Sequence, residues 1–177
     1  INFDQAESFR LGARVSDLGN KAFGRFPGID KVNADLVMGN NRLAARVHGN
    51  AVSIDFGDEF RAPLQADSLG MDVSLNRTAS GNLLVAAENI HLRNQDLNAI
   101  GRLRLETDGE QPPFMFLRAV FSDAVGASTG KYIPVRLLPK KTIDWLGQGI
   151  IDGFVPEGDL QFHGRLRDIF ELAREQA

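Results

Sequence analysis

The sequence predicts a mainly β protein: a curved antiparallel sheet or open groove of short strands, with one short α-helix at about residues 139–152. Apolar and polar residues alternate along most of the chain, which is the pattern of strands with one buried face. Glycine and asparagine recur between these stretches, and both tolerate the positive φ of tight turns. In one late stretch the apolar spacing changes to three or four residues, as in an amphipathic helix.

The composition fits a single β-rich domain over residues 1–177. Of the 177 residues, 43% are hydrophobic and 24% are charged, as in ordinary folded proteins. The chain starts at Ile1 and contains neither a signal segment nor the ~18 consecutive apolar residues of a membrane span. We therefore expect a piece excised from a longer protein, with residues 168–177 as a separate helical tail.

Four strands are predicted in the first third of the chain. They cover residues 9–15, 32–38, 43–47 and 52–56. Gly39-Asn40-Asn41 and Gly49-Asn50 are expected to form the turns between the last three, because both residue types tolerate positive φ. These three strands are therefore predicted to form a meander.

Five more strands are predicted downstream. They cover residues 69–75, 83–92, 102–106, 114–121 and 160–166, with an irregularity at Asn89. Residues 114–121 are apolar at every position except Arg118. A strand with this pattern is usually covered on both faces, so we expect it at the centre of the sheet.

The predicted helix contains Ile143, Leu146 and Ile150 at helical spacing. Pro139 suits its first turn, and Gly153 suits its C-terminal stop. Trp145 is expected to be a structural anchor that packs the helix against the sheet, because an indole in such a position usually belongs to the core.

A basic run precedes and begins this helix. Lys140 and Lys141 lie at the helix N-terminus, where the helix dipole disfavours cations. Lysines that snorkel at a helix entry would explain the run in structural terms. In functional terms, Arg136, Lys140 and Lys141 are candidates for contact with an anionic headgroup or with the acidic surface of a partner.

Chemical motifs are scarce, so we expect a protein that is not an enzyme and has no cofactor or metal. The chain has no cysteine and only three histidines, which fall in polar strand positions without the spacing of a zinc motif. Its net charge of −3 argues against nucleic acid as a partner. Asp55, Asp58 and Glu59 could pair in a carbohydrate hydrolase, but such a turn is usually just solvated.

One region resembles a known family. The matching residues are Tyr132-Ile133-Pro134, Asp144-Trp145-Leu146 and the segment from Val155-Pro156-Glu157-Gly158 to Leu166-Arg167-Asp168. They resemble the YhdP family of AsmA-like proteins, whose stretch combines Y-[IL]-P, W-L, P-x-G-[DN]-L and G-x-L-R-D. Trp145 and the spacing of Pro156, Gly158 and Leu160 are the most specific parts. Ile169-Phe170-Glu171 departs from the family pattern.

The resemblance implies the periplasmic part of an inner-membrane-anchored envelope protein. Such proteins are similar to bridge-like lipid transfer proteins, in which curved sheets stack into an apolar groove that carries phospholipid between the inner and outer membranes. Phospholipid, and other envelope proteins, would then be the partners. The alternative is a structural or interaction β-domain of the cell envelope with no lipid ligand.

Lipid contact, on this reading, would be made by apolar strand rows. Each buried methylene contributes ~0.8 kcal/mol, so a tail can be held without any polar motif. The candidates, whose neighbours in the strand are largely small or polar, are Leu69, Met71, Val73, Leu75, Leu83 and Val85.

Overall fold

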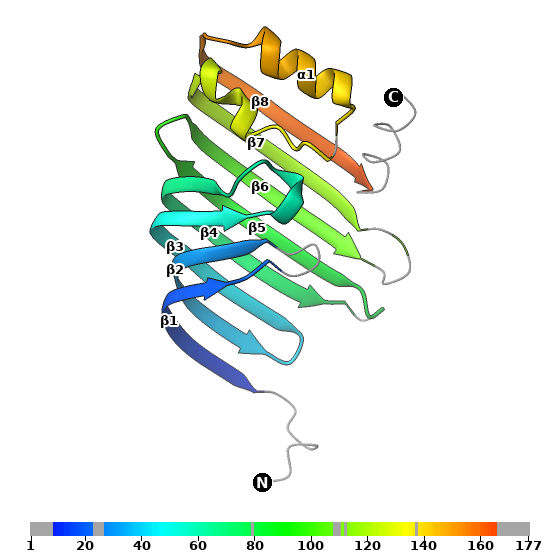
Figure 1. Ribbon diagram of the computed structural model, residues 1–177. Helices are drawn as coiled ribbons and strands as arrows, with labels where there is room; N and C mark the ends of the chain where they lie inside the picture. The colour runs from blue at the N-terminus through cyan, green and yellow to red at the C-terminus, as the bar shows by residue number, and fades with distance from the viewer. Residues whose placement is uncertain are drawn as a thin grey trace.

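The protein folds into one eight-stranded antiparallel sheet in which each strand pairs with the next in sequence (Figure 1). The computed structural model describes residues 9–22, 27–78, 80–107, 111, 113–136 and 138–165. The strands are β1 (Arg10–Asn20), β2 (Gly28–Gly39), β3 (Arg42–Asp55), β4 (Leu64–Arg77), β5 (Leu83–Arg93), β6 (Asn98–Thr107), β7 (Phe114–Val125) and β8 (Phe154–Arg165). Because β1 and β8 are not paired, the sheet is open, and the predicted fold class is confirmed.

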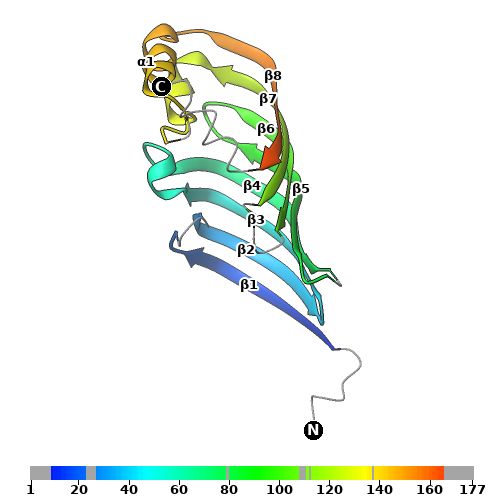
Figure 2. The ribbon, with the colours of Figure 1, turned by 90° about the vertical axis from the view of Figure 1, so that its right-hand side faces the viewer.

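Within the described residues, three short helical elements join these strands. They are η2 (Gly57–Glu59), η3 (Gly126–Lys131) and α1 (Lys140–Gly149). Figure 2 shows that the strands bend and that all three elements lie on the inner side of the bend. The helix predicted near residues 139–152 is confirmed, whereas the predicted tail at 168–177 lies outside the described residues.

The predicted turn at Gly49-Asn50 is wrong, because β3 runs unbroken from Arg42 to Asp55. A Cβ on Gly49 would lie 2.6 Å from the carbonyl oxygen of Lys31, so glycine is needed here for the close approach of β2. Ala51 then takes a φ of 52°, which accommodates an irregularity within the strand rather than a reversal. The turn predicted at residues 39–41 does join β2 to β3.

Left-handed backbone positions accompany the curvature of the sheet. Among the described residues, five that are not glycine have positive φ: Asp17, Lys31, Ala51, Asn89 and Asp123. They lie in β1, β2, β3, β5 and β7, and the register shifts next to several of them. Because bulges bend a strand and increase its twist, these positions explain how a single layer becomes a curved wall.

Two expectations about packing are corrected: that residues 114–121 lie at the centre of the sheet, and that Trp145 anchors the helix to the sheet. The strand expected at the centre of the sheet is β7, the seventh of eight, and none of its residues is buried. Its second apolar side carries Phe114 and Phe116, which contact the ring of His163 in the neighbouring strand instead of a second layer.

Trp145 does not anchor α1 to the sheet, because its side chain is 69% exposed. The indole lies along its own helix, over Gly149. The helix sits beside η3 near the strand ends and buries no residue completely, so it offers no deep site for an indole.

The core lies at one end of the sheet, under the connecting segments. Val32, Val52, Ala66 and Leu69 form its buried cluster, and none is more than 5% exposed. Ile133, which follows η3, is also buried. The opposite ends of the strands have no comparable cluster among the described residues, so one half of the sheet face is packed and the other half is open.

Candidate functional site: the apolar face of the sheet

The inner face of the sheet carries apolar rows that cross all eight strands. Pairing of directly opposed residues gives three complete rows. The first is Ala13, Leu36, Ala45, Val73, Ala87, Leu103, Leu117 and Phe162; the second is Leu11, Met38, Leu43, Leu75, Val85, Leu105, Met115 and Gly164; the third is Leu18, Val32, Gly49, Leu69, Leu92, Ala99, Phe121 and Gly158. We call this surface the apolar face. None of its rows contains a charged side chain.

The structure brings the six predicted lipid-contact residues together on this face, in β4 and β5. Val73 lies opposite Ala45 and Ala87, and Leu75 lies opposite Val85. Ser74, the residue between them, is paired with Ala44 and Ala86 and points to the other side of the sheet. The period-two pattern of the sequence therefore assigned the facing of these strands correctly.

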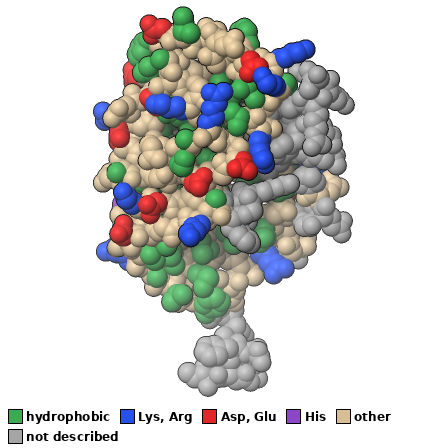
Figure 3. Space-filling view, viewed as in Figure 1, with side chains coloured by type: hydrophobic (Ala, Val, Ile, Leu, Met, Phe, Trp, Pro, Cys, Tyr) green, Lys and Arg blue, Asp and Glu red, His purple; other side chains and the backbone are tan. Residues whose placement is uncertain are grey.

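Exposure increases along the apolar face from the loop end to the open end. Leu69 is 5% exposed because it belongs to the core cluster. Met71, Val73 and Val85 are half-buried, whereas Leu75 and Leu83 are 37% and 38% exposed. Figure 3 shows hydrophobic side chains gathered over the first strands at the lower end of the visible face. A ligand on this face would contact the open half of these rows, and Leu69 would support it from beneath.

An apolar cavity of about 390 Å³ continues the face under η3. Leu92, Phe121 and Leu160 line it from the sheet, and Tyr132 lines it from the segment after η3. The element η3 thus covers part of the apolar face over β5 to β8, and the rest of this face is not covered by η3.

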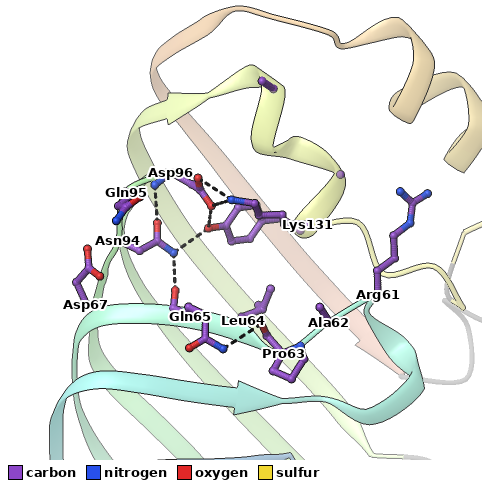
Figure 4. A pocket seen from close by; sticks show the side chains of 13 residues that line it. Arg61, Ala62, Pro63, Leu64, Gln65, Asp67, Asn94, Gln95, Asp96 and Lys131 are labelled. Carbon is purple, nitrogen blue, oxygen red and sulfur yellow. Dashed lines mark hydrogen bonds and ion pairs between the residues drawn. The ribbon is translucent and has the colours of Figure 1, made fainter.

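A polar cluster connects η3 and the residue after it to the loop between β5 and β6 (Figure 4). Asp96 accepts hydrogen bonds from the Ser128 hydroxyl at 2.7 Å and from the Tyr132 hydroxyl at 3.1 Å, and it forms an ion pair with Lys131 at 2.8 Å. The Asn94 amide donates to the Tyr132 hydroxyl at 2.8 Å and to the Gln65 carbonyl at 2.7 Å. The cluster therefore holds η3 at a fixed height above the sheet.

Burial and charge act on the two acidic groups of this cluster in different ways. Burial raises the pKa of Asp96, but hydrogen bonds from Lys131, Ser128 and Tyr132 outweigh it, so the pKa is lowered overall. Burial, together with the nearby Asp96 carboxylate, raises the pKa of Tyr132 to about 12. At neutral pH, Asp96 is therefore a charged acceptor and Tyr132 a neutral donor.

A cavity of about 570 Å³ lies beside this polar cluster. Arg61, Gln65 and residues of the cluster line it.

The outer face of the sheet, which we call the polar face, carries a ladder of opposed charges in its first half. Arg14, Asp35, Arg46 and Asp72 are directly opposite one another in β1 to β4. Arg14 pairs with Asp35 at 2.6 Å, and Arg46 pairs with Asp72 at 3.2 Å. The hydrogen bond from Arg14 lowers the pKa of Asp35, and those from Asn89 and Arg46 lower the pKa of Asp72. The charges of this ladder therefore balance one another.

The predicted headgroup candidates lie at the loop end, away from the open half of the apolar face. Arg136 pairs with Asp58 at 3.3 Å. Lys140 pairs with Asp144 at 2.6 Å, one turn along α1. Lys141 is exposed and has no ion pair within the described ranges. The pair with Asp144 offsets the charge of Lys140 at the helix N-terminus.

Arg77 is a rim residue that no sequence motif identifies. Arg77 is the last residue of β4, two positions after Leu75, and it lies opposite Leu83 in β5. The period-two pattern would have placed it on the apolar face, at the edge of the open end. A cation there can meet an anionic group while apolar tails lie on the rows behind it.

Two of the carboxylates considered for hydrolysis have other partners. Asp55 accepts a hydrogen bond from the Gly57 backbone amide at 2.8 Å, which caps the turn. Asp58 faces Arg136.

Comparison with known proteins gives one result. The family model described as YhdP protein matches residues 1–173. No curated protein and no solved structure matches the chain. Among the described residues, no helix has the length and apolar character needed to cross a bilayer.

Proposed function

The chain belongs to the YhdP family, a family of envelope proteins related to lipid transport, and from that premise we propose that it is one segment of a periplasmic lipid-transfer bridge. Its apolar face would carry phospholipid between the inner and outer membranes. The role is one of binding and passage, without catalysis. The full-length protein would be anchored in the inner membrane outside this segment.

The observation that carries the proposal is the set of three uncharged rows that cross the whole sheet. Strands lie ~4.8 Å apart, so eight strands make a path roughly 34 Å long. The row of Val73 presents an apolar side chain at every strand, so a tail exchanges one contact for a similar one as it moves. Such a path binds hydrocarbon without a deep trap.

The energy of this contact is sufficient without polar recognition. Roughly ten buried methylenes contribute about 8 kcal/mol. The open half of the face has room for tails because Leu75 and Leu83 are more than one-third exposed. Headgroups would remain at the rim, where Arg77 is placed to meet a phosphate. Arg136, Lys140 and Lys141 would act at the loop end, on headgroups or on an envelope partner.

Lipid extraction and native mass spectrometry of the purified chain test the proposal. We expect phospholipid to co-purify, with no preference for one headgroup, because recognition rests on the tails. A folded chain that carries no lipid, even after incubation with phospholipid vesicles, would contradict the proposal. It would favour the alternative of an envelope spacer or docking domain.

A further inference from the structure

The second half of the polar face differs from the first, because two of its arginines lie opposite each other instead of opposite carboxylates. Arg102 in β6 lies directly opposite Arg118 in β7, and like charges in such positions destabilise a sheet. Arg104 lies on the same face, opposite Phe116. No ion pair joins any of these three guanidinium groups to a carboxylate within the described ranges. In the first half, by contrast, opposed positions alternate in sign.

Exposed apolar side chains surround these arginines. Ile100 and Val120 lie directly opposite each other, two positions from the arginine pair, and are 59% and 37% exposed. On the other side, Arg102 lies over the Phe116 ring at 5.3 Å, and His163 packs edge-on against the same ring. A hollow of about 410 Å³ lies among Arg102, Arg104, Phe116 and His163.

This combination has the composition of a protein interface. Arginine and aromatic residues are enriched at the centres of interfaces, and a partly apolar surface supplies the burial that charge alone does not. We name the surface the arginine patch. It consists of Ile100, Arg102, Arg104, Phe116, Arg118 and Val120.

We propose that the arginine patch is a docking surface for an acidic polypeptide segment that also carries apolar side chains. The occupant follows from charge complementarity, because no described carboxylate pairs with these three cations, and an acidic segment can supply such partners. Glu88 and Glu106 border the hollow, and Asp159 lies opposite Val120. These carboxylates would repel a continuous anionic surface such as a membrane, but they leave space for a segment whose acidic groups are spaced between apolar ones.

The docking surface is independent of the lipid path, because it lies on the opposite face of the sheet. A partner bound there would leave the apolar rows uncovered. The chain could therefore hold lipid on one side and a protein on the other.

Fluorescence anisotropy with three labelled peptides tests this proposal. Leucine alternates with glutamate in the first, with glutamine in the second and with lysine in the third. We expect the intact chain to bind the glutamate peptide in preference to both others, with an affinity that falls as salt is added. Equal binding of the glutamate and glutamine peptides would overturn the proposal.

Charge reversals on the polar face locate the site. R102E/R118E should weaken binding of the glutamate peptide by about tenfold or more, whereas R10E/R42E, on β1 and β3 of the same face, should change it by less than about twofold. R102Q/R118Q serves if the reversal impairs folding, and it should also weaken binding. Equal effects of the two double reversals would show non-specific attraction and overturn the proposal. Binding of phosphatidylglycerol vesicles to the arginine patch, without binding of the glutamate peptide, would also overturn the proposal.

Discussion

Replacing Val73 by aspartate should block the lipid path while a neighbouring replacement leaves it intact. Val73 is central in its row, between Ala45 and Ala87, and is half-buried on the apolar face. A carboxylate there cannot be paired, because the rows on either side contain no cation. Contact of hydrocarbon with an unpaired charge is costly.

The size of the effect follows from the methylenes that would lose contact. If a tail withdraws two methylenes from the carboxylate, it loses about 1.6 kcal/mol at ~0.8 kcal/mol each, which corresponds to roughly a 15-fold loss of affinity. The fold itself should lose about 1–3 kcal/mol, because Val73 also packs on its neighbours. Ser74→Asp is the matched control, since it places the same charge on the polar face.

The assay is quantitative mass spectrometry of phospholipid that co-purifies with each folded variant. Circular dichroism and a urea titration confirm that the variants are folded. We expect V73D to retain less than about a tenth of the lipid that S74D retains. Equal lipid content in the two variants would refute the facing assigned to β4 and the path built on it.

Three further predictions concern the fold. Trp145→Ala should lower the free energy of unfolding by less than about 1 kcal/mol, because the indole is 69% exposed; a loss of about 3 kcal/mol in urea titration would show that it is packed. Gly49→Ala should cost about 1–3 kcal/mol, because its Cβ would meet β2, whereas Gly70→Ala, with open space around it, should cost little; equal costs would contradict the close approach. Asp96, whose pKa is lowered by folding, stabilises the protein above its unfolded pKa, and this contribution is lost as the pH falls through the folded pKa. Asp96→Asn should therefore flatten the acid limb of stability measured against pH, and an unchanged limb would exclude this role.

Alternation alone was enough to predict most of the sheet. Most strands have one apolar side, and a period of two leaves little choice of facing once that side must be buried. The facing of Val73 and Ser74, and the irregularity at Asn89, could therefore be expected from the residues themselves. The family resemblance carried by Trp145 and the residues after it is confirmed by the match over residues 1–173.

Features that depend on distant segments could not be predicted. Gly49-Asn50 has the composition of a turn, but the position of Lys31 in the neighbouring strand decides that Gly49 stays within β3. Trp145 was expected in the core because indoles usually are, yet α1 lies beside the sheet rather than on it.

Two candidate sites also required the structure. The cluster around Asp96 joins side chains from two separate segments and a backbone carbonyl from a third, so no motif signals it. The opposition of Arg102 and Arg118 depends on the register between β6 and β7, which the sequence does not reveal.

Site-specific photocrosslinking in cells tests the central claim most directly. A photoreactive amino acid is placed at position 73 or at position 74 of the complete protein, and the crosslinked adducts are analysed for phospholipid. Because Val73 faces the apolar rows and Ser74 faces away, we expect lipid adducts from position 73 and none from position 74. Equal labelling from both positions, or labelling from position 74 alone, would contradict it.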